Sequence, residues 1–172
     1  MTASRHLDVV VYGATGFVGR LTADYLAHHL PSGLTVGLAG RSLDKLEAVR
    51  AALPPAAAEW PLIIANADDP DSLAAMATET RVVITTVGPY ARYGMPLVQA
   101  CAEAGTDYVD LTGEVLFQRE SIDRFDDVAH RTGAASCTRA GSIRFRPISV
   151  FMPCGKPRTP TAPAHSPTPR SS

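Results

Sequence analysis

The feature that most constrains this chain is a run of three glycines close to its N-terminus. The β-branched segment 9–11 and Tyr12 lead into Gly13, Gly16 and Gly19, and an amphipathic pattern begins directly behind them. This order predicts a buried strand, a tight turn and a helix. The unpaired N–H groups and the positive dipole at the start of such a helix favour an anion there.

Each glycine has a physical purpose in a dinucleotide-binding turn. The first allows the sharp turn, the second lets the backbone approach a pyrophosphate, and the third lets helix and sheet pack closely. A turn that is only structural is the alternative interpretation. The residues assigned to the cofactor here are Gly13, Ala14, Thr15, Gly16, Phe17, Val18 and Gly19.

Behind the turn, apolar strand patterns alternate with helical patterns. Strands are expected at 8–12, 34–39, 60–65, 81–87 and 108–111. Helices are expected at 17–30, 43–52 and 117–131, with two more beginning at 71 or 72 and near 94. Strands that are apolar on both faces and alternate with helices predict a doubly wound parallel α/β sheet, a Rossmann-like domain over residues 1–134. Ligands bind beyond the carboxyl ends of such strands.

Composition excludes several classes of protein. Apolar residues make up 45% of the chain and the mean hydropathy is +0.02, typical of a globular protein. No run of about 18 uncharged apolar residues predicts a membrane span, and the first residues lack a signal-peptide layout. The three cysteines lack metal-ligand spacing and the five histidines do not cluster. We therefore expect a cytoplasmic protein with reduced thiols and no metal.

The loop after the second strand indicates which cofactor is bound. A domain that prefers NAD usually presents an acidic residue to the ribose 2′-hydroxyl group. This chain has Arg41 and Ser42 instead. A guanidinium pairs well with a 2′-phosphate, and the serine hydroxyl can add a hydrogen bond, so the pattern predicts NADP. A solvated surface arginine, with Ser42 as a helix N-cap, is the alternative.

The loops after the third and fourth strands supply further candidates. Asp68 can accept from the adenine amino group or can cap the next helix. The turn after the fourth strand either runs beside the nicotinamide and its ribose or only ends the strand. The residues assigned to the cofactor from this turn are Thr86, Val87, Gly88 and Pro89.

Two carboxylates, Asp110 and Glu114, follow the fifth strand. They can bind substrate or order water, or they can fix the loop through hydrogen bonds to backbone N–H groups. The Tyr-x-x-x-Lys pair of short-chain dehydrogenases does not follow Tyr90, Tyr93 or Tyr108. The catalytic residues are therefore unknown at this stage.

Four segments, 13–20, 38–42, 86–90 and 108–114, together resemble the saccharopine dehydrogenase-like oxidoreductases, most closely the mycobacterial trans-acting enoyl reductases. The resemblance covers about residues 7–134. It implies an NADP-linked reductase that saturates a double bond of a polyketide-type chain during glycolipid assembly. It also implies a small-molecule or lipid-type substrate, no nucleic-acid partner, and peripheral association with the plasma membrane. A module that binds NADP without catalysis and a non-functional truncated product are the alternatives.

The chain changes character near residue 134. Residues 1–134 have a net charge of −7, whereas residues 135–172 have six basic residues, no acidic residue and seven of the fourteen prolines. Such a segment is typical of disorder, of a polyproline ligand or of a nucleic-acid arm. The family continues instead into a sixth strand and a substrate domain, which we expect to be absent here, leaving the fifth strand exposed.

A shift of reading frame near residue 134 accounts for this change. One permitted coding string for Ala135–Ser149, read two bases later, gives Ile-Val-His-Ser-Cys-Gly-Phe-Asp-Ser-Ile-Pro-Ser-Asp-Leu, which resembles the family's own continuation. Sequencing the coding DNA tests the hypothesis. We expect the shifted frame to encode this peptide, and a codon set incompatible with it would refute the frameshift.

Overall fold

The computed structural model describes residues 5–31 and 33–138. Their strands form one parallel six-stranded sheet with the order β3-β2-β1-β4-β5-β6. The strands are β1 (Leu7–Tyr12), β2 (Val36–Gly40), β3 (Leu62–Ile64), β4 (Thr80–Thr85), β5 (Asp107–Val109) and β6 (Ser136–Cys137). The helices are α1 (Phe17–His29), α2 (Leu43–Ala52), α3 (Pro70–Thr78), α4 (Tyr90–Tyr93), α5 (Met95–Ala104) and α6 (Val115–Thr132), with a 3-10 turn at Pro55–Ala57. This strand order confirms the predicted doubly wound, Rossmann-like fold.

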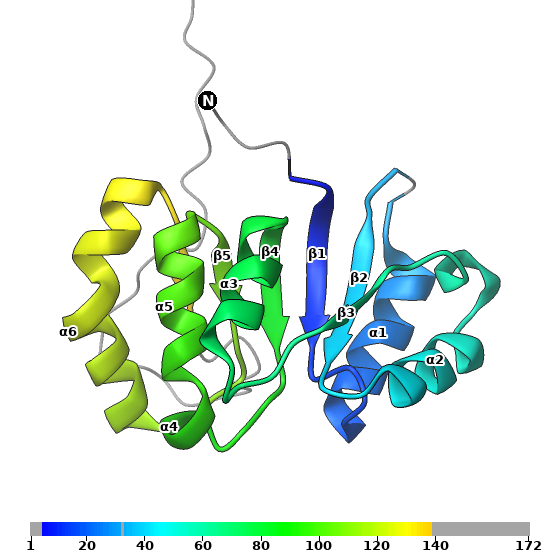
Figure 1. Cartoon of the computed structure of the whole chain (residues 1–172), viewed down its shortest axis with the longest axis horizontal. Helices are drawn as coiled ribbons and strands as arrows, with labels where there is room; N and C mark the ends of the chain where they lie inside the picture. The colour runs from blue at the N-terminus through cyan, green and yellow to red at the C-terminus, as the bar shows by residue number, and fades with distance from the viewer. Residues whose placement is uncertain (1–4, 32, 139–172) are drawn as a thin grey trace, which may run out of the picture.

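Two hydrophobic clusters join the helices to opposite faces of the sheet. Val11 of β1 belongs to the cluster with residues of α1 and α2, whereas Val10 and Tyr12 belong to the cluster with residues of α3, α5 and α6. This alternation follows from the two-residue period of a strand. All five residues of β2 are buried, as expected for a central strand covered on both faces. The strand arrowheads point to one edge, where the β1–α1 turn and α4 lie (Figure 1).

Several element boundaries differ from the sequence prediction for local reasons. The third strand is only Leu62–Ile64, because the backbone N–H of Trp60 bonds back to Ala57 in a turn before it. The fourth strand ends at Thr85 rather than at 87. The short helix α4 was not predicted, and Glu114, distant in sequence, provides the acceptor at its start.

The expectation that a sixth strand is missing was wrong. Ser136 and Cys137 form β6, which pairs in parallel with Tyr108 and Val109 of β5. The N–H of Tyr108 bonds to Ala135 O at 2.8 Å. Two paired residues are enough to cover the backbone of the short strand β5. The basic, proline-rich segment predicted for 135–172 lies outside the described residues from 139 onward.

Large apolar side chains remain at the surface near the carboxyl ends of the strands. Phe17 at the start of α1 is 81% exposed and Leu116 at the start of α6 is 85% exposed. Over residues 5–31 and 33–138, none of the helices combines the length and hydropathy needed to cross a membrane.

Candidate NADP-binding site

The predicted glycine turn connects β1 to α1 at the carboxyl edge of the sheet. Gly13 has a φ of +86°, in the left-handed region that favours glycine. A Cβ atom added there would lie 2.8 Å from both the Thr86 hydroxyl oxygen and a Val87 methyl carbon. Gly13 N also donates to Ala39 O at 2.9 Å, which anchors the turn to the end of β2. Both the conformation and the space around this position therefore require glycine.

Gly19 explains how α1 can lie directly on this turn. A Cβ atom at Gly19 would collide with the carbonyl oxygen of Gly13 and would lie 2.8 Å from the Cα of Ala14. At Gly16 the nearest neighbour would be the Gly13 oxygen at 3.3 Å. The predicted sharp turn and close helix packing are thus confirmed at Gly13 and Gly19.

The N-terminus of α1 is well suited to an anion. Its N-cap, Gly16, has no side chain to bond the first N–H groups, and no acidic residue lies in the first turn of this helix. The positive end of the helix dipole is therefore not neutralised by the helix's own residues. The bare glycine backbone and this uncompensated dipole fit a dinucleotide pyrophosphate.

The loop after β4 is fastened to the same turn. The Thr86 hydroxyl lies 3.3 Å from both Tyr12 O and Gly13 O and donates toward them, while Thr86 N donates to Tyr12 O at 3.0 Å. The side chain of Val87 lies against Gly13, and the Gly88–Pro89 peptide bond is cis. Thr86 therefore connects the strands on either side of the point where the strand order reverses.

Arg41 and Ser42 stand at the carboxyl end of β2, on the other side of the glycine turn. Arg41 is exposed, and Ser42 is the N-cap residue of α2, but its side chain makes no capping hydrogen bond within the described structure. The Thr15 side chain lies 3.9 Å from the position that a Cβ of Gly40 would occupy. The structure therefore brings the glycine turn and the Arg41 loop to the same part of the edge.

Asp68 lies in the loop after β3 and does not cap α3. The capping residue is Asp69, whose carboxylate accepts from Ser72 N at 3.4 Å. Asp68 is exposed. Burial and, less strongly, the charge of Asp68 raise the pKa of Tyr12 to about 12, and the charge of Arg41 opposes this rise. Both charged side chains therefore lie within electrostatic reach of the Tyr12 hydroxyl.

The structure decides between the alternatives for Asp110 and Glu114. Asp110 is 2% exposed and accepts from the Tyr108 hydroxyl at 2.9 Å and from Thr112 N at 3.0 Å. Glu114 accepts from Tyr90 N and Ala91 N, both at 2.8 Å. Both carboxylates hold the loops in place. The sequence left this role open as one of two alternatives, and it did not identify the partners of Glu114 because α4 was not predicted.

Comparison with known proteins agrees with this geometry. The family described as "Saccharopine dehydrogenase NADP binding domain" matches residues 9–145. The chain belongs to this family. Its cofactor is NADP.

Two mycobacterial relatives match over most of the chain. The trans-acting enoyl reductase of Mycobacterium tuberculosis (strain ATCC 25618 / H37Rv) is 59% identical over 134 residues, which are 77% of this chain and 31% of the relative. The trans-acting enoyl reductase of Mycobacterium ulcerans is 53% identical over 133 residues, 77% of this chain and 32% of the relative. The chain thus spans about a third of the length of these curated relatives.

Solved structures share the fold of this NADP-binding domain. Apo saccharopine dehydrogenase from Saccharomyces cerevisiae superposes with a TM-score of 0.62 at 21% identity, over 78% of this chain and 27% of the other. The Citrobacter triphenylmethane reductase complexed with NADP(H) has a TM-score of 0.56 at 15% identity, over 77% and 48% of the two chains.

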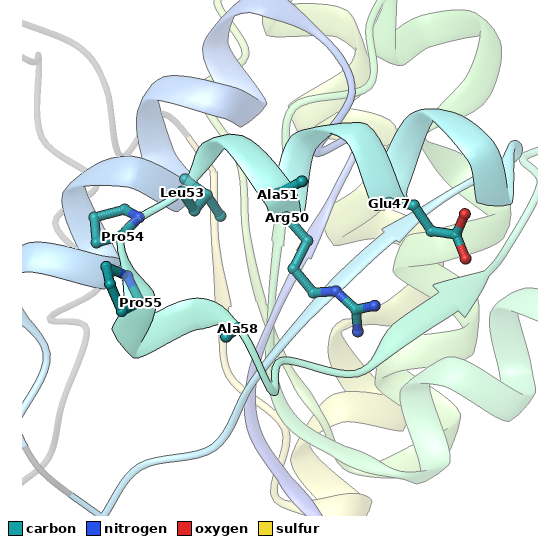
Figure 2. A pocket seen from close by; sticks show the side chains of 7 residues that line it. All are labelled: Glu47, Arg50, Ala51, Leu53, Pro54, Pro55 and Ala58. Atoms are coloured by element: carbon teal, nitrogen blue, oxygen red, sulfur yellow. The ribbon is translucent and has the colours of Figure 1, made fainter.

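Two cavities among the described residues lie away from the glycine turn. One of about 520 Å³ is formed at the C-terminal end of α2 (Figure 2). It is lined by Glu47, Arg50, Ala51, Leu53, Pro54, Pro55 and Ala58. Arg50 is engaged there, since it donates to Trp60 O at 3.1 Å. A second, of about 510 Å³, lies beside β3 and α3. Neither of these two cavities is lined by a residue of the glycine turn.

The hydrogen bonds that Glu114 accepts from Tyr90 N and Ala91 N at the start of α4 lead to a prediction. Glu114→Ala removes two charge-assisted hydrogen bonds and leaves two helix-start N–H groups without their acceptor, which costs about 2–4 kcal/mol. Thermal unfolding should show a melting temperature several degrees lower. Glu120→Ala is the control, because its contact with Arg124 is an exposed ion pair of one helix. Equal melting temperatures for the two variants would contradict a stabilising role of the Glu114 hydrogen bonds.

Proposed function

We propose that this chain is the NADP-binding part of an NADPH-dependent enoyl reductase of complex lipid or glycolipid biosynthesis. The observation that carries the reaction class is the 59% identity with the trans-acting enoyl reductase over 134 residues. Because the chain spans 31% of that relative, the reaction is proposed for the complete reductase. What this chain contributes is the binding and orientation of the cofactor.

The phosphates of the cofactor would bind along the edge formed by β1 and β2. The N–H groups at the start of α1 would face the pyrophosphate, with Gly16 allowing its close approach. The exposed guanidinium of Arg41 would pair with the 2′-phosphate, and the Ser42 hydroxyl, not used as a cap, would add a hydrogen bond.

The nicotinamide end would lie along the turn from Thr86 to Pro89. Two sets of hydrogen bonds fix this turn. Thr86 at its start donates to the glycine turn, and Tyr90 N directly after it donates to the Glu114 carboxylate. A rigid backbone there fixes the orientation of the nicotinamide ring. When bound, NADPH supplies the hydride for reduction, and the chain's own residues orient the ring.

A cofactor-binding module without turnover is the second candidate function. It is favoured by the loop hydrogen bonds that already engage Asp110 and Glu114, the two carboxylates that follow β5. A short chain of this kind would bind NADPH and reduce nothing by itself. Assay of the bound complex with an enoyl thioester distinguishes the two, because reduction of the double bond by this chain alone would refute the module.

Titration with NADPH and NADH, followed by fluorescence and thermal shift, tests the site. We expect NADPH to bind more tightly and Arg41→Ala to weaken NADPH at least tenfold while changing NADH little, since a charge-assisted bond to phosphate is lost. The control is Arg119→Ala, whose guanidinium pairs with Asp123 on α6. Equal loss for both nucleotides would refute the 2′-phosphate contact, and absence of any binding would refute the cofactor site.

We also infer a lipid-type substrate, and with it a location in the cytoplasm with peripheral contact to the plasma membrane. The support is the relationship to the enoyl reductases and the exposed apolar residues Phe17 and Leu116 at the edge of the site. Sedimentation with phospholipid vesicles measures the membrane contact. Recovery of all the protein in the supernatant would count against it.

A further inference from the structure

Helix α1 carries large apolar side chains on its outer side. Phe17 is 81% exposed, Leu21 is 56% exposed and Tyr25 is 61% exposed. The buried residues of this helix are the small Gly19 and Ala23. A surface helix normally shows the reverse arrangement, with its large apolar residues against the core. Packing within the domain therefore does not account for the three exposed residues.

Phe17, Leu21 and Tyr25 form one continuous strip, which we call the α1 stripe. They follow one another at intervals of four residues, so they lie above one another on one face of the helix over about 12 Å. The ring of Tyr25 is ordered at one end, because it stacks on His29 with ring centroids 4.1 Å apart. Contiguous exposed apolar surface of this kind is typical of an interaction site.

Two oppositely charged residues border the α1 stripe. Arg20 and Asp24 are both exposed, and their spacing of four places them on the same flank of the helix. Among residues 5–31 and 33–138, the Arg20 side chain has no hydrogen bond or ion pair, and the charged neighbour of Asp24 is the His28 ring at 3.7 Å. Arg20 also lies near the positive end of the helix dipole, where a cation is unfavourable unless an anion is close. The flank therefore offers a guanidinium and a carboxylate to a partner.

The order of these groups along α1 is self-complementary. A two-fold axis brings identical surfaces together, so two antiparallel helices meet their counterparts in reverse order. With the axis level with Thr22, Arg20 of each copy is level with Asp24 of the other, because both lie two residues from Thr22. The aromatic ends of the two stripes then lie beside each other, and the two Leu21 side chains meet between them.

We propose that α1 forms an antiparallel pair with α1 of a second copy of this chain. The pairing buries the α1 stripe of both copies, gives Arg20 a carboxylate and places the two helix dipoles in opposite directions. A lipid surface offers Asp24 no cation, whereas a second copy does. Phe17 is covered in this dimer, which leaves Leu116 as the apolar residue of the proposed membrane contact. The assignment does not depend on the proposed function.

The first test is sedimentation velocity of the full chain without nucleotide or lipid. An interface of one helix per copy is small, so we expect a monomer–dimer equilibrium with a dissociation constant between about 1 μM and 1 mM. Leu21→Asp places a carboxylate at the centre of the α1 stripe and should abolish the dimer over this range. Ile122→Asp is the matched control, because Ile122 is 53% exposed on α6, and it should dimerise as the wild type does.

The second test is a charge exchange on the flank. Arg20→Glu should weaken the dimer about tenfold, because two symmetric exposed ion pairs are lost. The same change suits the helix dipole, so the melting temperature should not fall. Adding Asp24→Arg to Arg20→Glu should restore most of the affinity, because the pairs form again with their charges exchanged. Apolar association without a defined register would not respond to this exchange.

Three results would overturn the pairing. They are a wild-type protein that stays monomeric up to about 1 mM, a dimer that survives Leu21→Asp, and a double variant that dimerises as weakly as Arg20→Glu alone. A monomer that sediments with anionic phospholipid vesicles, and loses this binding in Leu21→Asp, would assign the α1 stripe to a membrane instead.

Discussion

The contact on which the rest of the site depends is the packing of the α1 backbone against the β1–α1 turn. Because Gly19 has no side chain, the helix lies directly on the carbonyl oxygen of Gly13. Because Gly13 has none either, the side chains of Thr86 and Val87 can pack against the turn. Three backbone segments thus meet where the strand order reverses. A β-carbon at either glycine would push α1 or the β4 loop away, and the helix N-terminus would no longer face the edge where the other candidate residues lie.

Hydrogen bonds connect this turn to the neighbouring loops along the same edge of the sheet. Thr86 connects the turn to β4, and Glu114 connects the start of α4 to the loop after β5. Asp110 fixes the same loop by accepting from Thr112 N, and burial, followed by the charge of Asp110, raises the pKa of Tyr108, whose hydroxyl donates to Asp110. These acidic residues therefore hold the loops after β4 and β5 in place, whereas Arg41 and Asp68, which follow β2 and β3, are exposed.

Local patterns were sufficient to predict the fold but not the partners of the polar loops. The strand and helix periods, and the glycine spacing, depend on neighbours in sequence, and both the sheet order and the tight positions at Gly13 and Gly19 agree with the prediction. The bonds of Glu114 to Tyr90 and Ala91 span more than twenty residues. These bonds depend on how two loops meet in space. The sequence positions of the carboxylates therefore could not show whether they bind substrate or hold the loops in place.

The proposed cofactor binding would be separable from the proposed reduction because the described domain has its own core. Both hydrophobic clusters are formed by residues between Leu7 and Ala129, and they cover opposite faces of the sheet. A unit with its own core can fold and bind a ligand as a domain. The part of the enoyl reductases that this chain matches is 31% of their length, so the surfaces that recognise the substrate would be supplied largely by the rest of the protein. Leu116, which lies two residues beyond Glu114 and is 85% exposed, offers an apolar side chain that such a surface could cover.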